Sequence, residues 1–140
     1  MKIIYWSGTG NTETIAKLIA KGITNQGLDT QVINISESSV ENIKDEFVIL
    51  GCPSMGNEEL EECEFVPFLE SVQDQLINKR VFLFGSYGWG DGEWMRTWEE
   101  NMSSMGIDIP LDPLIINGLP EGEDEDSCIK YGEEIAKLIK

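Results

Sequence analysis

Short apolar segments alternate with amphipathic segments along the chain, and this alternation predicts the order of its elements. Compact apolar runs without polar interruptions are typical of strands that are covered on both faces, as in a parallel sheet. Segments with apolar positions three or four residues apart predict helices. The predicted strands are Lys2–Trp6, the weakly alternating Thr30–Ile35, Phe47–Gly51, Val81–Gly85 and Leu114–Ile116. The predicted helices are Asn11–Gln26, Phe65–Gln75, Glu93–Met105 and Asp126–Lys140.

Strands that alternate with helices in this way build right-handed β-α-β units. The predicted fold class is therefore α/β, a three-layer, doubly wound, five-stranded parallel sheet. The sequence has no repeat, no low-complexity tract and no linker, so we expect residues 1–140 to form one domain. In an open sheet of this kind, ligands bind at the carboxyl edge of the strands.

Composition excludes several classes of function. The chain has 26 acidic residues against 10 lysines and arginines, a formal net charge of −16, and it has no histidine. This charge opposes binding to nucleic acid and to anionic membranes. The lack of histidine excludes Ser-His-Asp and Cys-His catalytic pairs and imidazole metal sites, so we expect no metal.

The cysteines and the apolar runs indicate where the protein works. Cys52, Cys63 and Cys128 do not have the spacing of a metal site or a disulfide framework, so we expect reduced thiols and a cytoplasmic location. No apolar run is long enough to span a membrane. The amino-terminal segment has the pattern of a strand rather than of a signal peptide.

The segment Ser7-Gly8-Thr9-Gly10-Asn11-Thr12 follows the first predicted strand and favours a phosphate site. Its glycines expose consecutive N–H groups, and the start of a helix adds donors and a partial positive charge. The segment has no Gly-Lys-Ser/Thr ending, so it is not a nucleotide P-loop, and Glu13 breaks the dinucleotide motif GxGxxG. The alternative is an ordinary strand–helix turn with an Asn or Thr N-cap.

Two further loops follow the third and fourth predicted strands. In Pro53-Ser54-Met55-Gly56-Asn57-Glu58, the methionine offers a polarizable face to an aromatic ligand, and Gly-Asn tolerates unusual backbone angles. The alternative is a plain turn with a surface methionine. In Ser86-Tyr87-Gly88-Trp89-Gly90-Asp91-Gly92, a tryptophan between glycines favours stacking on a ligand, whereas the alternative is a buried tryptophan at a bend.

These three loops all follow strands, so they meet at one edge of a parallel sheet. A phosphate loop, a methionine and a tryptophan at one edge predict a flat aromatic ligand that carries a single phosphate. The other tryptophans are expected to pack in the protein interior; they are Trp6, Trp94 and Trp98.

The motifs SGTGNT, MGNE and FGSYGWGDG, in this order, resemble the flavodoxins, and more narrowly the short-chain clostridial type. The resemblance runs from Met1 to the carboxy-terminal helix. It implies the strand order 2-1-3-4-5, one non-covalent FMN, and electron transfer rather than enzymatic catalysis. The expected cofactor-binding residues are Ser7, Gly8, Thr9, Gly10, Asn11, Thr12, Ser54, Met55, Gly56, Asn57, Glu58, Ser86, Tyr87, Gly88, Trp89, Gly90, Asp91 and Asn117.

The same resemblance implies roles for these residues. The segment 7–12 would bind the phosphate, and Met55 and Trp89 would flank the isoalloxazine. The turn at residues 55–57 would adjoin flavin N5, Glu58 would hold the ring N3–H, and the backbone of residues 88–90 would face the pyrimidine end. Asn117, with Gly118, would approach the ring or the ribityl chain. The family often has Gly-Asp or Gly-Gly at the turn, where this chain has Gly-Asn.

We expect a low-potential one-electron carrier that cycles mainly between semiquinone and hydroquinone. A flip of the peptide between Gly56 and Asn57 could present a carbonyl to the N5 hydrogen, a gain of about 1 kcal/mol. The three loops contain no cation, so the anionic hydroquinone lacks a partner and is disfavoured by nearby acids. These acids, which could alternatively be a solvated face, are Glu58, Glu59, Glu61, Glu62, Glu64, Asp91 and Glu93.

The expected partners follow from the acidic surface. Redox proteins with basic patches should be steered to it in transient complexes. We expect a monomer that binds neither nucleic acid nor membranes. The acidic run at residues 121–126 is expected to be a solvated face and a favourable helix start.

Three other functions are compatible with an α/β sheet. A phospho-acceptor domain needs acids at strand ends that here carry Trp6-Ser7 and Cys52-Pro53. A phosphatase needs an arginine to close a loop opened by Cys52, and none occurs before Arg80. An FMN-dependent reductase acting directly on a small substrate stays open as the alternative, although the chain shows no second nucleotide loop.

Overall fold

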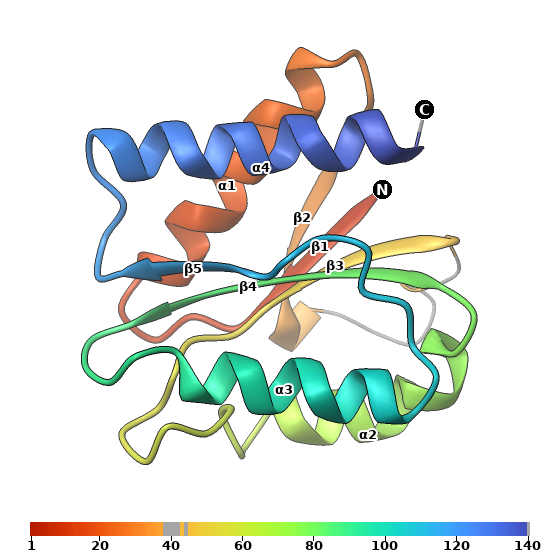
Figure 1. The fold of residues 1–140 in the computed structure, drawn as a ribbon, viewed down its shortest axis with the longest axis vertical. Helices are drawn as coiled ribbons and strands as arrows, with labels where there is room; N and C mark the ends of the chain where they lie inside the picture. Colours follow the sequence, from red (N-terminus) through yellow and green to blue (C-terminus); the bar gives the residue numbers. More distant parts are fainter. Residues whose placement is uncertain (38–42, 44, 140) are drawn as a thin grey trace.

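A computed structural model describes residues 1–37, 43 and 45–139. Five strands form one parallel sheet in the order β2-β1-β3-β4-β5, as predicted (Figure 1). The strands are β1 (Lys2–Tyr5), β2 (Gln31–Asn34), β3 (Phe47–Gly51), β4 (Arg80–Tyr87) and β5 (Leu114–Asn117). The helices are α1 (Asn11–Asn25), α2 (Phe65–Leu76), α3 (Glu93–Ser104) and α4 (Glu123–Ile139), with a short 3-10 helix η1 (Ile35–Glu37).

The predicted elements are present, and their ends differ from the prediction by up to three residues. The largest difference is at α4, which begins at Glu123 because the acids of its first turn are favoured by the positive end of the helix. Strand β4 extends to Tyr87 because its carboxyl half pairs with β5. Lys137 lies in the last turn of α4, and Lys140 lies outside the described residues.

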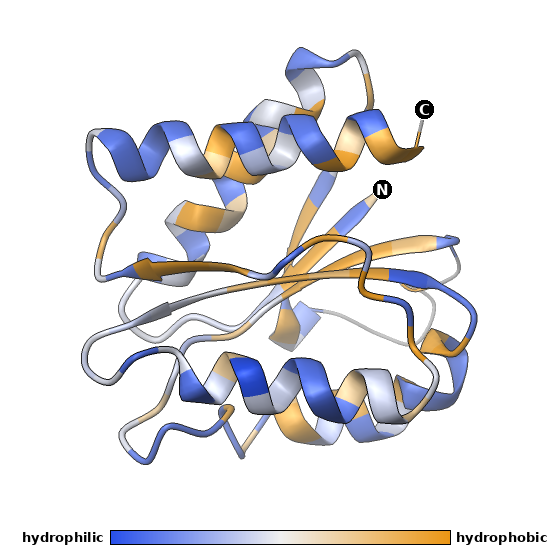
Figure 2. Ribbon diagram, in the orientation of Figure 1, coloured by the Kyte–Doolittle hydropathy of each residue, from blue (hydrophilic) through white to orange (hydrophobic). Residues whose placement is uncertain are grey.

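Two helices cover each face of the sheet (Figure 1). Helices α1 and α4 lie on one face, and α2 and α3 lie on the other. The strands are largely apolar, and the helices present apolar positions to them (Figure 2). Neighbouring residues of one strand serve opposite faces, because Ile3 packs in the core under α1 and α4 while Ile4 packs in the other core.

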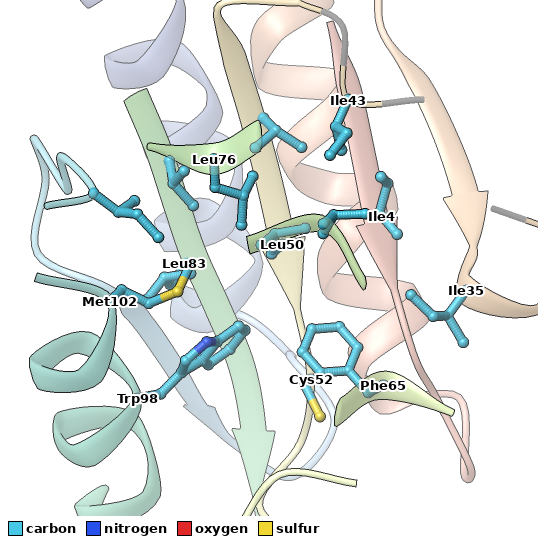
Figure 3. Close-up of a cluster of buried hydrophobic side chains, with 14 of the residues drawn as sticks. Ile4, Ile35, Ile43, Leu50, Cys52, Phe65, Leu76, Leu83, Trp98 and Met102 are labelled. Atoms are coloured by element: carbon cyan, nitrogen blue, oxygen red, sulfur yellow. The ribbon is translucent and has the colours of Figure 1, made fainter. Parts of the chain in front are cut away.

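The core under α2 and α3 contains two of the predicted interior tryptophans. Trp94 and Trp98 are 2% and 3% exposed, so the prediction is confirmed for both. Trp98 contacts Phe65 of α2 edge to face, with ring centroids 5.4 Å apart (Figure 3). This contact joins the helix that follows β3 to the helix that follows β4, and it holds both beneath the sheet.

Helices α1 and α4 approach each other so closely that no side chain fits between them at two points. A Cβ at Gly22 would overlap the carbonyl oxygen of Ile129, and a Cβ at Gly132 would overlap that of Ile19. Only glycine permits this contact. It joins the first helix to the last one and fixes α1 against the sheet.

A buried carboxylate shapes the segment between β3 and α2. Glu61 is 5% exposed, and its carboxylate accepts the N–H groups of Cys63 (2.7 Å), Glu64 (2.7 Å) and Phe65 (2.9 Å). These are amides at the start of α2, which have no partner within the helix. Burial raises the pKa of the Glu61 carboxyl, but the three donors outweigh it and the pKa lies below its usual value. Glu61 is therefore a helix cap, and its burial shows that the alternative of a solvated face is wrong for this residue.

The described residues show neither a membrane-spanning helix nor a cluster of metal ligands, and their cysteines are free. No helix there is both long enough and apolar enough to cross a membrane. No group of three or more acidic, cysteine or histidine residues among residues 1–37, 43 and 45–139 is arranged to hold a metal ion. The three cysteines are free, Cys63 being exposed and Cys52 and Cys128 buried.

We predict that Gly132→Ala lowers the free energy of unfolding by about 2 kcal/mol. An overpacking cost of about 3 kcal/mol exceeds the helix propensity gained with alanine, about 1 kcal/mol. Urea unfolding followed by circular dichroism measures the difference. Lys21→Ala, at an exposed position of α1, is the control and should change stability by less than about 0.5 kcal/mol. Equal stability of Gly132→Ala and the unmodified protein would contradict the packing argument.

We predict that Glu61→Gln destabilises the protein by about 2 kcal/mol at neutral pH, because hydrogen bonds to a charged acceptor are lost. The folded pKa of Glu61 is lowered, so its stabilisation is present above the unfolded pKa of about 4.3 and is lost as the pH falls through the folded pKa. Urea unfolding from pH 7 downward should show that the difference in unfolding free energy between Glu61→Gln and the unmodified protein becomes smaller. The exposed Glu62→Gln is the control. A difference in unfolding free energy that increases as the pH falls would contradict the role of Glu61 as a helix cap.

Candidate functional site

The carboxyl ends of the strands lie together at one edge of the sheet, at the left of Figure 1. Backbone hydrogen bonds continue past the strands, from Ser54 N–H to the Ser86 oxygen and from Gly118 N–H to the Tyr87 oxygen, both 2.9 Å. The loops that leave this edge therefore start from fixed positions. They comprise residues 6–10, 52–64, 88–92 and 118–122.

A cavity of about 520 Å³ opens between these loops. Its volume falls in the range of small-molecule sites, roughly 300–1,000 Å³. It brings together parts of all three loops that the sequence singled out, and none of its lining residues is charged. The lining residues are Trp6, Gly8, Thr9, Asn11, Pro53, Ser54, Met55, Gly56, Ser86, Tyr87, Gly88 and Gly118.

The loop before α1 is held open by its own hydrogen bonds. The Ser7 hydroxyl accepts the N–H of Gly10 at 3.0 Å, and the Thr14 hydroxyl donates to the Gly10 oxygen at 2.9 Å. Gly10 itself is the N-cap, in the left-handed region with φ of 96°, so the alternative of an Asn or Thr N-cap is wrong. Within the described part of the chain, the side chains of Thr9 and Asn11 have no hydrogen-bond partner, which leaves them available to a ligand.

Two of the predicted site residues bond to each other. Thr12 and Ser86 are buried, and their hydroxyl oxygens are 2.8 Å apart. This bond joins the first turn of α1 to the end of β4. It fixes the helix N-terminus beside the cavity, where the amides of the first turn are favourable for an anion.

Trp6 packs against the core under α2 and α3, as predicted, but it is only half-buried and also lines the cavity. Its indole N–H donates to the Glu64 carboxylate at 3.1 Å. A Cβ at Gly8 would lie 2.9 Å from the indole ring, so glycine allows the ring to cover the loop. The signal in the sequence was its position, because Trp6 directly precedes the phosphate-type loop at the end of a strand.

The segment after β3 contains a β-turn. Glu58 N–H donates to the Met55 oxygen, and Met55 N–H donates to the Glu59 oxygen, both at 2.9 Å. The left-handed residue is Glu58, with φ of 56°, whereas Gly56 and Asn57 have ordinary angles. The unusual angle expected at Gly-Asn therefore occurs one residue later.

Only part of the third loop lines the cavity. Trp89 is 59% exposed and does not line the cavity, whereas Tyr87 and Gly88 do. The carboxylate of Glu58 packs on Gly90, where any Cβ would overlap it. The expected site residues that do not line the cavity are Ser7, Gly10, Thr12, Asn57, Glu58, Trp89, Gly90, Asp91 and Asn117.

The rim carries an acidic group with one cation. Loss of solvent raises the pKa of Glu58, the carboxylates of Glu93 and Asp91 raise it further, and Arg96 opposes them. The Arg96 guanidinium lies 2.9 Å from the Asp91 carboxylate and lowers the pKa of that carboxyl. Arg96 escaped the sequence analysis because it stands in α3, five residues after Asp91, and outside every loop that was singled out.

The phosphatase alternative requires a reactive Cys52, and the structure opposes this. Cys52 is fully buried, and its sulfur accepts the N–H of Glu61 at 3.4 Å. Burial raises the pKa of the Cys52 thiol to about 12, so it is protonated at neutral pH. Cys52 is a packing residue.

The cavity fits the ligand that the sequence predicts. Thr9, Asn11 and the start of α1 supply neutral donors for a phosphate. Trp6, Met55 and Tyr87 supply apolar and aromatic surface for a flat ring.

Comparison with known proteins gives consistent relatives. The flavodoxin family model matches residues 3–132. The flavodoxin of Clostridium beijerinckii is 50% identical over 139 residues, which are 99% of this chain and all of the relative. The flavodoxin of Megasphaera elsdenii is 40% identical over 138 residues, or 98% of each chain. The solution structure of two-electron reduced Megasphaera elsdenii flavodoxin superposes with a TM-score of 0.87 at 38% identity, covering 97% of this chain and 98% of that one.

The relatives match along nearly their whole length, so the similarity includes every loop of the cavity edge. The clostridial relative also agrees with the narrower resemblance seen in the motifs. The chain thus belongs to the flavodoxin family, small electron-transfer proteins that bind one non-covalent FMN.

Proposed function

We propose that this flavodoxin is a low-potential carrier that shuttles single electrons between redox enzymes, mainly through the second of the two one-electron steps of FMN. The observation that carries the proposal is the distribution of charge. The residues that line the cavity are all uncharged, while Glu58, Asp91 and Glu93, on the segments that adjoin it, form an acidic group in which Arg96 is the one cation among the described residues that act on Glu58.

The cofactor site in this proposal uses residues of all three loops. Thr9, Asn11 and the amides at the start of α1 would hold the phosphate, and Met55, with Trp89 on the exposed loop, would flank the ring. Bound FMN supplies the one-electron chemistry. Glu58, placed on Gly90 at the rim, accepts the ring N3–H. The remaining expected site residues shape the loops that position these groups.

Negative charge added to the site by the second electron meets no compensating cation in the cavity. The described cation beside Glu58, Arg96, is already paired with Asp91 at 2.9 Å. Glu58 and Glu93 leave a net negative rim, so the second step is shifted to low potential. The water-exposed position of these groups weakens each pairwise effect, which makes their number and common sign decisive.

The turn at Met55–Glu58 would raise the potential of the first one-electron step. Its closing hydrogen bond uses the Met55 oxygen and Glu58 N–H, which leaves the peptide between Gly56 and Asn57 outside that bond. Nothing lies within 4 Å of a Cβ built at Gly56, so this peptide has room to rotate. A rotated carbonyl could accept a hydrogen bond from an N–H at flavin N5, worth about 1 kcal/mol.

We further propose a monomer that works in the cytoplasm and forms transient complexes with basic redox partners. Free cysteines are typical of a reducing compartment, and the described thiols are unpaired. The net charge of −16 opposes self-association and favours basic partners.

Stepwise reduction of the purified yellow protein tests the function. We expect a long-wavelength absorption band that grows with the first electron and bleaches with the second, with the second potential well below the first. Uptake of both electrons in one step would overturn the carrier mechanism. Mixing with NAD(P)H alone is the accompanying control, because rapid bleaching would favour a reductase, and a shuttle should not react.

Electrostatic steering makes a separate prediction. The second-order rate of electron transfer to a partner with a basic docking surface should fall at least tenfold between about 10 mM and 500 mM salt. Stopped-flow mixing with horse cytochrome c, a basic one-electron acceptor, measures this rate. A rate that is constant over this range would refute steering.

A further inference from the structure

Arg96 is the cation that the fold brings to the acidic rim. Its guanidinium donates from Nη1 to the Asp91 backbone oxygen at 3.0 Å and from Nη2 to the Asp91 carboxylate at 2.9 Å. One planar group thus holds both the main chain and the side chain of the loop at residues 88–92, which bears Trp89. The geometry suits arginine, whose donors are fixed in a fork.

Glu58 reaches the same group of charges from another loop. Its carboxylate lies on Gly90, next to Asp91 in the chain, and Gly92 lies close to Arg96. The groups that act on Glu58 are the carboxylates of Glu93 and Asp91, which oppose its ionisation, and the guanidinium of Arg96, which favours it. Three carboxylates from two loops and α3 therefore share one cation.

We propose that Arg96 is a positioning residue of the cofactor site, which fixes the loop at residues 88–92 to α3 and supplies positive charge to the group of carboxylates in which Glu58 lies. The proposal rests on the role given to Glu58 above, as acceptor of the flavin N3–H. An ionised carboxylate is a stronger acceptor than a protonated one. Arg96 therefore sets the lower pH limit at which the site holds FMN tightly.

If Arg96 only stabilised the fold, its replacement would lower the unfolding midpoint. The side chains of Arg96 and Asp91 are 58% and 81% exposed, and exposed ion pairs add little to folding stability. We therefore expect Arg96 to affect the pH dependence of the site and not the unfolding midpoint.

The experiment compares Arg96→Met and Arg96→Lys with a charge-matched control. Lys17→Met removes one equally exposed cation that pairs with Glu13 at 3.0 Å on α1, and Lys17 does not line the cavity. Two quantities are measured from pH 8 down through the ordinary carboxyl range, to about pH 4: the FMN dissociation constant, by fluorescence quenching, and the titration of the Glu58 carboxyl carbon, by NMR.

In Arg96→Met we expect Glu58 to titrate at higher pH and FMN binding to weaken about fivefold at the acidic end. Arg96→Lys should restore most of the Glu58 titration but less of the affinity, because lysine lacks the fork that holds the loop. Lys17→Met should match the unmodified protein. Indistinguishable Glu58 titrations in Arg96→Met and Lys17→Met would overturn the proposal.

The NMR titration also separates this inference from the proposed function. It can be recorded on the unmodified chain and its variants without FMN, so a chain that binds no FMN still tests the effect of Arg96 on Glu58. Glu58→Gln combined with Arg96→Met completes the test. If Arg96 acts through Glu58, Glu58→Gln and the double variant should show the same pH dependence of the FMN dissociation constant. A pH-dependent difference between these two variants would overturn the proposal.

Discussion

Parallel pairing of all five strands is the constraint on which the site depends. A parallel sheet must be covered on both faces, so each strand is followed by a segment that returns over the sheet. Every connection from a carboxyl end then leaves from the same edge. Hydrogen bonds beyond the strands, such as Ser54 to Ser86 and Gly118 to Tyr87, extend that order into the loops. Residues more than 70 positions apart, such as Thr12 and Ser86, meet for this reason.

The acidic residues have distinct physical roles that their common charge conceals. Glu61 is buried, and its charged carboxylate is stabilised by the N–H groups of residues 63–65, so it stabilises the segment beside the cavity. The acids at residues 123–126 occupy the first turn of α4, where the helix favours them. Glu58, Asp91 and Glu93 gather at the rim and interact mainly with one another and with Arg96.

Much of the fold could be predicted because uninterrupted apolar runs indicate strands that are buried on both faces. The residue types of the loops indicate the edge of the sheet at which the site lies. The strand order came from the resemblance of the loop motifs to a family. Contacts between distant segments left no local signal. The close approach at Gly22 and Gly132, the pairing of Arg96 with Asp91 and the burial of Glu61 each depend on partners that only the tertiary structure supplies. The packing of Trp6 was predicted but its place in the cavity wall was not, because an apolar residue at a strand end can serve in a core, in a cavity wall or in both.

The uncharged lining of the cavity reconciles two demands that would otherwise conflict. A lysine or arginine among the lining residues would bind a phosphate more strongly, but it would also stabilise the negative charge that the second electron brings. Backbone amides and the side chains of Thr9 and Asn11 offer hydrogen bonds to the phosphate without a full positive charge. Arg96 does not disturb this balance, since its charge is already matched by Asp91 outside the cavity. If the proposed function is correct, neutral donors in the cavity would allow the protein to bind the phosphate and still keep the second potential low.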